Sequence, residues 1–342
     1  SGVPRLDYPL IDGVVQDCPA LLLEPTRTNL ALYSEQFDNA YWGKTSNLSI
    51  SPDYSISPNG AQNADRWVST GGSFPQMTRT ISGLTIGQTY TASLYVKSDG
   101  TSQIEQRLHF TGFAGTLFTP TDEWVRITNT FTATSTSHVL VLFTNSGSAP
   151  ASSYLIWGAM VENGSYKTSY IPTTTSSVTR NADECNNAGT SAEFNDSEGV
   201  LFVEFSALAN DLTHRRIAIS DGTTSNLVYV SFDTTSNRIL ANANGRIMVY
   251  TVTDETEFQK AAVYYNATAP KLYVNGFLRE TETTMSAISG LNELAFDNGT
   301  GGNNFYGKVK QLMVFNEALT DSELEQITSW TSFGEMAKGQ LY

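Results

Sequence analysis

Histidine and cysteine are scarce in this sequence, and their scarcity excludes several kinds of site. The chain has only three histidines and two cysteines among its 342 residues. His109, His138 and His214 stand far apart, and no H-E-x-x-H, C-x-x-C or EF-hand spacing occurs. No serine lies in a G-x-S-x-G elbow, and neither cysteine has a histidine close to it in the sequence. We therefore predict that the protein is not an enzyme, although a catalytic site assembled from distant residues stays open.

The two cysteines, Cys18 and Cys185, lie at either side of the first candidate domain. Neither has a metal-ligand spacing, and two widely separated cysteines are most simply two free thiols. A disulfide between them stays the alternative, because the ends of a sandwich domain can meet.

Positive charge and long apolar runs are also in short supply. Charged residues make up 16% of the chain, and 20 lysines and arginines face 34 aspartates and glutamates, which gives a net charge of −14. Such an acidic chain repels phosphate backbones, so nucleic acid is not an expected partner. The apolar run at residues 20–23 ends at Glu24, far short of the roughly 18 residues that span a bilayer. Membrane insertion is not expected either.

The sequence is rich in segments whose pattern predicts β-strands. In TYTASLYVKS (89–98), apolar residues alternate with polar ones, which predicts a strand with one buried face. HVLVLFT (138–144) is apolar on both faces and is typical of a central strand. A chain of this length suits two domains. We predict an all-β protein of two antiparallel β-sandwiches of jelly-roll type.

Composition sets the predicted domain boundaries. Residues 174–197 are rich in threonine, serine, asparagine and aspartate, as in a domain crossing, and residues 3–30 carry four prolines. The prediction is a lead-in at residues 1–30 that packs on the first sandwich, a first sandwich at 31–175, a linker at 176–197 and a second sandwich at 198–342.

Two local signals in the second half are specific. Asn275-Gly276 separates two apolar runs and predicts a hairpin with a type I′ turn. Thr320 and Glu323 have the spacing of a helix capping box, and Leu319 and Leu324 that of a hydrophobic staple. A short C-terminal helix is therefore expected against the second sandwich.

Two groups of residues are candidates for binding. The loop FDNGTGGNNF (296–305) offers carboxylate and amide groups at Asp297, Asn298, Asn303 and Asn304, which suit sugar hydroxyls or calcium. The alternative is a long hairpin loop built from turn-forming residues. Tyr41 and Trp42 are the aromatic pair expected to be most accessible for stacking on a sugar ring, with packing in the core as the alternative. No cofactor is predicted beyond a structural calcium ion.

The first half of the chain resembles segments of phage and prophage tail-fibre proteins. The resemblance rests on CPALLLEPTRTNLALYSEQFDNAYW (18–42), ISPNGAQNADRWV (56–68) and WGAMVENGSYKTSYIPTTTSSVTRNAD (157–183). It implies a jelly roll like that of carbohydrate-binding modules, closed by residues 157–173, whose aromatic side chains we expect to pack in the sandwich. It also implies a virion tail protein that is assembled in the bacterial cytoplasm and acts outside the cell. Its expected partners are bacterial surface polysaccharide and other tail proteins, in a homotrimeric parent, although no coiled-coil or β-helix pattern encodes a trimer.

The second half resembles a concanavalin A-like, laminin-G-type sandwich. The matching parts are SEGVLFVEFSA (197–207), FQKAAVYYNATAPKLYVNGFLRE (258–280) and GKVKQLMVFNEALTDSELEQI (307–327). Many functions share that fold, so the resemblance implies the fold more firmly than an activity. Glycan-cleaving enzymes also use it, but the Gln-x-His motif of alginate lyases and the E-x-D-x-x-E motif of laminarinase-type hydrolases are missing here. The expected function is host glycan binding without catalysis; a depolymerase (lyase or hydrolase) and a purely structural tail adaptor are the alternatives.

Overall fold

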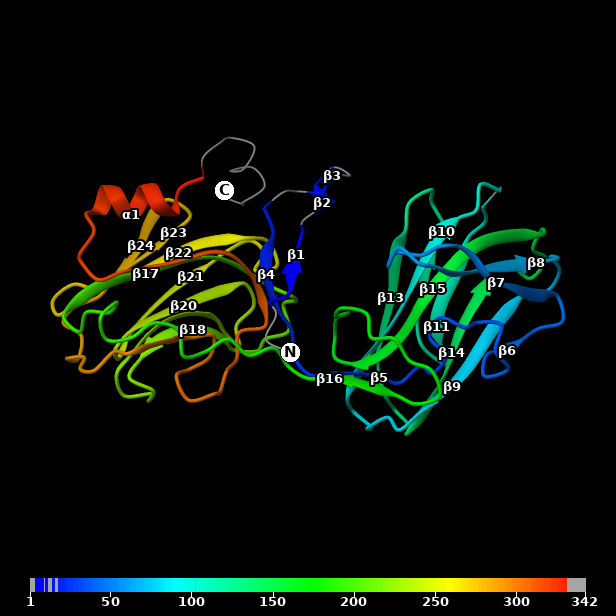
Figure 1. The fold of residues 1–342 in the computed structure, drawn as a ribbon, viewed down its shortest axis with the longest axis horizontal. Helices are drawn as coiled ribbons and strands as arrows, with labels where there is room; N and C mark the ends of the chain where they lie inside the picture. The colour runs from blue at the N-terminus through cyan, green and yellow to red at the C-terminus, as the bar shows by residue number, and fades with distance from the viewer. Residues whose placement is uncertain (1–3, 9, 12–13, 16–17, 102, 331–342) are drawn as a thin grey trace. The chain divides into compact units, whose positions relative to one another are not determined.

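A computed structural model describes residues 4–8, 10–11, 14–15, 18–101 and 103–330 (Figure 1). Apart from one short helix its regular elements are β-strands, and every strand pair is antiparallel. The chain forms two compact units. Residues 26–181 form the first sandwich, and residues 182–342 together with residues 1–25 form the second. The predicted fold class, two antiparallel sandwiches, is confirmed.

Two five-stranded sheets enclose the core of the first sandwich. One sheet has, in spatial order, β13 (Val125–Thr132), β10 (Thr89–Ser98), β15 (Ser152–Asn163), β8 (Gln62–Ser69) and β7 (Leu48–Ile56). The other has β12 (Thr116–Phe118), β11 (Gln106–Phe110), β14 (Ser137–Thr144), β9 (Gln76–Ser82) and β6 (Gly43–Lys44). A two-stranded ribbon pairs β5 (Arg27–Asn29) with β16 (Val178–Arg180).

The second sandwich packs a seven-stranded sheet against a five-stranded one. The larger sheet runs β1 (Leu6–Asp7), β4 (Ala20–Leu23), β26 (Gly307–Phe315), β17 (Glu198–Ala207), β22 (Gln259–Asn266), β23 (Lys271–Val274) and β24 (Phe277–Thr281). The smaller runs β21 (Arg246–Thr251), β20 (Arg238–Ala243), β19 (Leu227–Phe232), β18 (Arg215–Ser220) and β25 (Glu293–Ala295). A further pair joins β2 (Leu10–Ile11) to β3 (Val14–Val15).

Both local predictions in the second sandwich are confirmed. Asn275 and Gly276 have φ angles of 53° and 84°, as a type I′ turn requires between β23 and β24. The helix α1 (Asp321–Thr328) begins at the Thr320 N-cap with both hydrogen bonds of the capping box to Glu323. Leu324 is fully buried against the outer face of the seven-stranded sheet.

The predicted place of the lead-in is wrong for its described residues up to Pro25, whereas residues 26–30 belong to the first sandwich as predicted. β4 pairs with β26 and extends the seven-stranded sheet of the second sandwich instead of packing on the first. The reason is its apolar character: Ala20 and Leu23 are buried, and Leu23 joins the second core. The expected linker also differs from the prediction, because Val178–Arg180 forms β16 of the first sandwich and Phe194 is buried in the second core.

Candidate functional site

The loop predicted to bind ligand keeps most of its polar groups for its own turn. Asp297 is buried and its Oδ1 accepts a hydrogen bond from the Gly299 amide at 2.6 Å. The Asn298 side-chain oxygen accepts from the Thr300 amide and hydroxyl and from the Gly302 amide, at 2.9–3.1 Å. These contacts are those of a loop built from turn-forming residues.

Asn303 and Asn304 lie beside the outer face of the smaller sheet of the second sandwich. The Asn303 carbonyl accepts a hydrogen bond from the Arg216 amide at 3.0 Å. Asn304 forms an isolated parallel β-bridge with the same arginine. The Arg216 guanidinium lies over the Tyr229 ring, 4.2 Å from its centroid. The loop therefore brings two of its four predicted residues next to a stacked arginine. Whether they bind a ligand stays a prediction.

Tyr41 and Trp42 belong to the first sandwich, and neither offers an open ring face. Trp42 is 3% exposed, and its indole N–H donates to the Tyr33 carbonyl at 3.1 Å. The half-buried Tyr41 ring lies against the Arg79 guanidinium, at 3.7 Å. Trp42 is therefore not accessible for stacking, and the alternative of packing in the core is confirmed, because the turn after Phe37 folds the indole into it.

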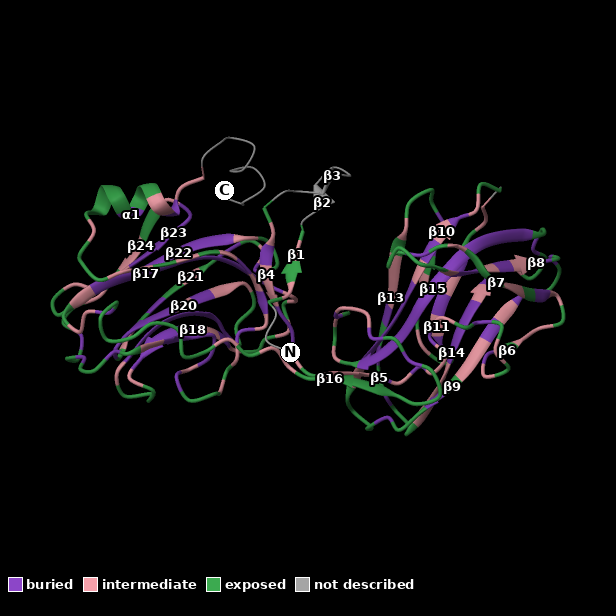
Figure 2. Ribbon diagram, viewed as in Figure 1, coloured by how far each residue is buried: buried purple, intermediate pink, exposed green. Residues whose placement is uncertain are grey.

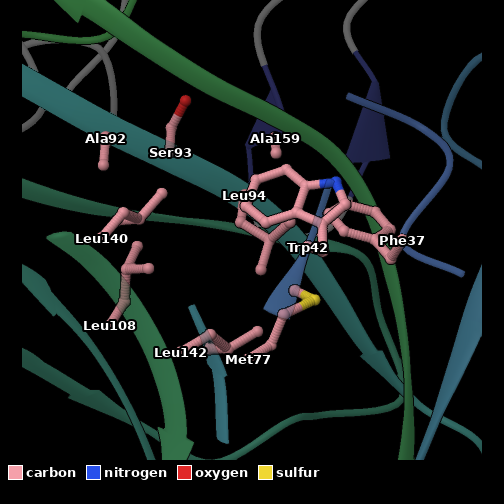
Figure 3. Close-up of a pocket in the computed structure, with 10 residues that line it drawn as sticks. All are labelled: Phe37, Trp42, Met77, Ala92, Ser93, Leu94, Leu108, Leu140, Leu142 and Ala159. Atoms are coloured by element: carbon pink, nitrogen blue, oxygen red, sulfur yellow. The ribbon is translucent and has the colours of Figure 1, made fainter. Parts of the chain in front are cut away.

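Trp42 also lines a small internal cavity (Figure 3). The cavity has a volume of about 20 Å³ and is lined mostly by apolar side chains from both sheets. Such a space is large enough for one water molecule but lacks the polar partners that would hold it. It is a packing defect of the core, with no room for a ligand.

The closing segment of the first sandwich covers one of the two outer sheet faces. After β15 the chain turns at Gly164 and returns across the outer face as residues 164–173, here called the strap. Tyr170 of the strap packs on Trp157, with ring centroids 4.5 Å apart, and Trp157 is 3% exposed. The expected packing role of these aromatic residues is confirmed, but they form a layer outside the sheet.

A buried carboxylate holds the strap. Glu162 has no exposed side-chain surface, and its two oxygens accept from the Thr168 amide at 2.9 Å and hydroxyl at 2.6 Å. Arg27 lies 3.4 Å from the same carboxylate. Burial raises the pKa of Glu162, although the two hydrogen bonds from Thr168 oppose the shift. This network also explains why Thr91 and Ser93, predicted to face solvent on β10, are buried.

The other outer face of the first sandwich is less buried among the described residues. Its side chains come from alternate positions of β9, β11, β12 and β14. The register of these strands shows which of the side chains are neighbours. We call this surface the open face; its members are Gln76, Thr78, Thr80, Arg107, His109, Leu117, Val139, Val141 and Phe143, with Phe74 beside them. Only two of the seven residues of β9 are buried, and Figure 2 shows intermediate positions along this strand, in contrast to the buried β15.

Aromatic rings form the centre of the open face. Phe143 lies 5.3 Å from the His109 ring and 6.2 Å from the Phe74 ring, measured between centroids. Phe74 is 47% exposed and Leu117 is 49% exposed. Apolar surface of this kind on a sheet face needs an explanation, because it would otherwise be shielded from water.

Polar groups border these rings. Arg107 is directly opposite Phe143 in the sheet, and its buried Nε has no hydrogen-bond partner among the described residues. Burial, aided by the charge of Arg107, lowers the pKa of His109, which keeps the imidazole neutral at neutral pH. Gln76 continues the same row of the sheet. The face combines ring surfaces with amide, hydroxyl, imidazole and guanidinium groups.

Sequence reasoning missed this face for an identifiable reason. His109 looked isolated in the sequence, and the strand at 138–144 looked buried on both sides. Val141 is indeed buried, but Phe143 and Val139 are half-exposed. The only available signal was the period-2 spacing of Arg107 and His109, which points both side chains to one face.

A second depression lies at the rim of the first sandwich. It has a volume of about 260 Å³ and is lined by Thr26, Arg27, Thr28, Leu30, Gly83, Tyr90 and Asn163. Neither this depression nor the core cavity has an aspartate or glutamate in its lining. Neither therefore offers the carboxylate pair of a glycoside hydrolase.

The described residues contain no group of three or more histidine, cysteine, aspartate or glutamate side chains placed to hold a metal ion. Cys18 and Cys185 are both free thiols. Within the described ranges, no helix has the length and apolar character needed to cross a bilayer. The predicted calcium ion stays a prediction.

Solved structures that are similar to this chain are distant from it. A carbohydrate-binding module (CBM40) of the Ruminococcus gnavus IT-sialidase, bound to α2,3 sialyllactose, is 16% identical; the alignment covers 43% of this chain and 96% of the module, with a TM-score of 0.35. Domains LG4-5 of the mouse laminin α1 chain are 11% identical, with 81% and 90% covered and a TM-score of 0.28. The CBM22 tandem of Paenibacillus barcinonensis Xyn10C is 10% identical, with 85% and 98% covered and a TM-score of 0.31. Likeness at these TM-scores supports no functional argument.

No curated protein matches the chain. One family model does, over residues 193–325, and it describes the concanavalin A-like lectin/glucanases superfamily. The matched residues begin just before β17 and end in α1, so they span nearly all of the second sandwich. This sandwich is therefore a concanavalin A-like domain, as its sequence indicated.

Proposed function

We propose that this protein binds glycans without cleaving them, and that the open face of the first sandwich is the main binding surface. The observation that carries the proposal is the cluster of aromatic rings at Phe74, which is 47% exposed, and the half-buried Phe143 and His109, bordered by Arg107 and Gln76. Ring faces stack on the apolar face of a pyranose, while amide and guanidinium groups bind its hydroxyls. A flat strip of this kind suits a polymer that lies across the strands.

The setting that we propose is a phage or prophage tail, with bacterial surface polysaccharide as the partner. The sequence segments of the first half that resemble tail-fibre proteins support this setting. The family matched by the second sandwich includes lectins, which supports a second glycan contact there, beside Arg216 and Asn303. Two weak sites on one chain, repeated in several copies on a particle, would bind a repeating polymer by avidity.

A polysaccharide depolymerase is the second candidate, because the matched family also includes glucanases. The buried carboxylates do not favour it. Asp65 accepts from the Phe37 and Asp53 amides, and Glu255 from the Asn237 amide, so both are engaged in holding loops. The geometry therefore supports binding better than cleavage.

The experiment that tests the proposal is retention of labelled protein on an array of bacterial surface polysaccharides. The Phe74→Ala/Phe143→Ala double variant removes the aromatic centre, and Ile86→Ala is the matched control, because Ile86 is 61% exposed in a turn outside the face. We expect saturable retention of the wild type and of the control, and at least a tenfold loss for the double variant.

Three other outcomes have defined meanings. Equal retention of the double variant and the wild type would move the site away from the open face. Loss of the spotted polymer would favour the depolymerase. No retention of folded wild-type protein on any glycan would overturn the proposed function and leave a structural adaptor.

A further inference from the structure

A turn in the first sandwich closes around a side-chain ammonium. Lys44 is the second residue of the short edge strand β6, and its Nζ lies among four backbone carbonyl oxygens. The distances are 2.8 Å to Phe37, 3.2 Å to Asp38, 3.1 Å to Asn39 and 3.0 Å to Trp42. An ammonium has three protons, so the turn offers more acceptors than Lys44 has donors.

Carbonyl groups that converge in this way need a cation between them. Their partial negative charges repel one another, and in the turn only the Asn39 carbonyl also accepts a backbone hydrogen bond, from the Trp42 amide. The field is strengthened by the carboxylates of Asp38 and Asp65, which favour the charged form of Lys44. Burial is the larger effect and lowers the pKa of Lys44, because it removes part of the water around the ammonium. The carbonyl oxygens replace that lost hydration.

The distances indicate which class of cation the turn suits. Calcium binds oxygen at about 2.3–2.6 Å and magnesium at about 2.0–2.1 Å, both shorter than the distances found here. Rings of backbone carbonyls that replace a hydration shell are how proteins bind potassium. The turn at residues 37–42 therefore has the dimensions for a large monovalent cation.

We propose that residues 37–42 form a monovalent-cation site whose resident cation is the Lys44 ammonium of the same chain. The tethered charge fixes the turn that carries Tyr41 and Trp42, so the first sandwich requires no free ion at this position. Removal of the ammonium converts the turn into a vacant site for ammonium or potassium ions. This inference is independent of the proposed glycan binding.

The test is thermal unfolding of the full chain, followed by tryptophan fluorescence. Four of the five tryptophans, Trp42, Trp67, Trp124 and Trp157, lie in the first sandwich, so the signal reports mainly on it. The variants are Lys44→Ala and Lys44→Met, each in the chlorides of ammonium, potassium, calcium and tetramethylammonium at one ionic strength. Tetramethylammonium supplies the same charge but is too large to enter the turn.

Lys97→Ala is the matched control, because Lys97 is a half-buried lysine on β10 whose side chain makes no hydrogen bond or ion pair to a described residue. We expect both Lys44 variants to unfold at least about 4 °C below the wild type in tetramethylammonium chloride. Ammonium or potassium should return at least half of that loss. The unfolding temperatures of the wild type and of Lys97→Ala should show the same dependence on the four cations.

Two results would overturn the proposal. One is a Lys44→Ala protein that unfolds at the wild-type temperature, which would mean that the turn needs no cation. The other is a destabilised variant that recovers equally in tetramethylammonium, or best in calcium. If Lys44→Ala fails to fold, the yield of refolded Lys44→Met is measured in ammonium chloride and in tetramethylammonium chloride. A higher yield in ammonium supports the proposal, and equal yields overturn it.

Discussion

The two sheets of the first sandwich have the same number of strands, but their outer faces differ in how far they are covered. The outer face around β10 and β15 is covered by the strap, which packs Tyr170 on Trp157 and bonds Thr168 to Glu162. The outer face around β11 and β14 keeps Phe74 47% exposed, with the half-buried Phe143 beside it. The strap covers the first face, and the second face stays partly accessible to a ligand.

The difference teaches what it costs to close a sheet face. A strap brings backbone and side-chain polar groups into a buried space, and each of them needs a partner. Glu162, Arg27 and Arg126 supply those partners beneath residues 164–173. The described residues of the open face include no comparable buried carboxylate.

The second sandwich shows the same division in a different form. Helix α1 covers the outer face of the seven-stranded sheet through Leu324, and polar contacts such as the ion pair between Lys271 and Asp321 add to this packing. The outer face of the smaller sheet keeps Ile247 and Val249 exposed, at 45% and 38%. Ala218, Leu227 and Tyr229 on the same face are buried, so this face is only partly open.

The largest expected effect comes from removing the carboxylate beneath the strap. Glu162→Ala leaves the Thr168 amide and the Arg27 charge without their partner, which should lower the free energy of unfolding by about 3 kcal/mol. Urea unfolding followed by tryptophan fluorescence measures it. The control is Glu105→Ala, an exposed carboxylate whose side chain contacts Asn145, with an expected change below about 0.5 kcal/mol. Equal effects of the two substitutions would remove the distinction between closed and open faces.

A buried carboxylate of the second sandwich should make stability depend on pH. Burial raises the pKa of Glu255 to about 7, while Arg215 partly opposes the shift and Asp211 and Asp254 add to it. Because the folded pKa lies above the ordinary value of about 4.5, the folded state binds the proton more tightly. The contribution is therefore fully present below about pH 4.5 and is lost as pH rises through about 7.

The corresponding measurement is the free energy of unfolding of the second sandwich at pH 5 and pH 8, by far-ultraviolet circular dichroism. We expect a decrease on the order of 2 kcal/mol for the wild type. Glu255→Gln should flatten the profile, since an amide does not titrate. A wild-type profile that rises from pH 5 to pH 8 would mean that Arg215 dominates the environment of Glu255.

Local signals of this chain were predictable from sequence, because their physics is local. The Asn275-Gly276 turn and the Thr320 capping box each depend on residues within four positions of one another, and both are present in the structure. The alternation in β10 also gave the correct inner face. Its outer face was misjudged, because the strap that buries Thr91 arrives from about 70 residues further along the chain.

The candidate site depended on longer-range information and was less predictable. Whether Phe143 is exposed depends on the absence of a cover, which no pattern within 138–144 encodes. The Asp297 and Asn298 side chains had the chemistry of a ligand site, but the same chemistry closes their own turn. Polar composition alone does not distinguish a group that waits for a ligand from one that is already bonded.

The N-cap of α1 tests how the helix holds its position on the closed face of the second sandwich. Thr320→Ala removes the side-chain oxygen that accepts from the Glu323 amide and should cost about 1 kcal/mol. Ser322→Ala, at an exposed position of the same helix, is the control and should change stability by less than about 0.5 kcal/mol. A Thr320→Ala protein as stable as the control would mean that other contacts, such as the packing of Leu324 and the Lys271–Asp321 ion pair, are enough to position the helix. Urea unfolding by circular dichroism distinguishes the two cases.

The smallest expected effect is on the open face, where it is most informative. Leu117 is 49% exposed on the edge strand β12, so Leu117→Asn should change the free energy of unfolding by less than about 0.5 kcal/mol. Trp157→Ala, beneath the strap, is its counterpart and should cost about 3 kcal/mol. If Leu117→Asn instead costs more than about 1 kcal/mol, and the cost grows with protein concentration, a second copy covers the face in solution. A cost that does not change with concentration would place a part of this chain over the face. In either case the face would be closed, and the argument that it is free for a glycan would fail.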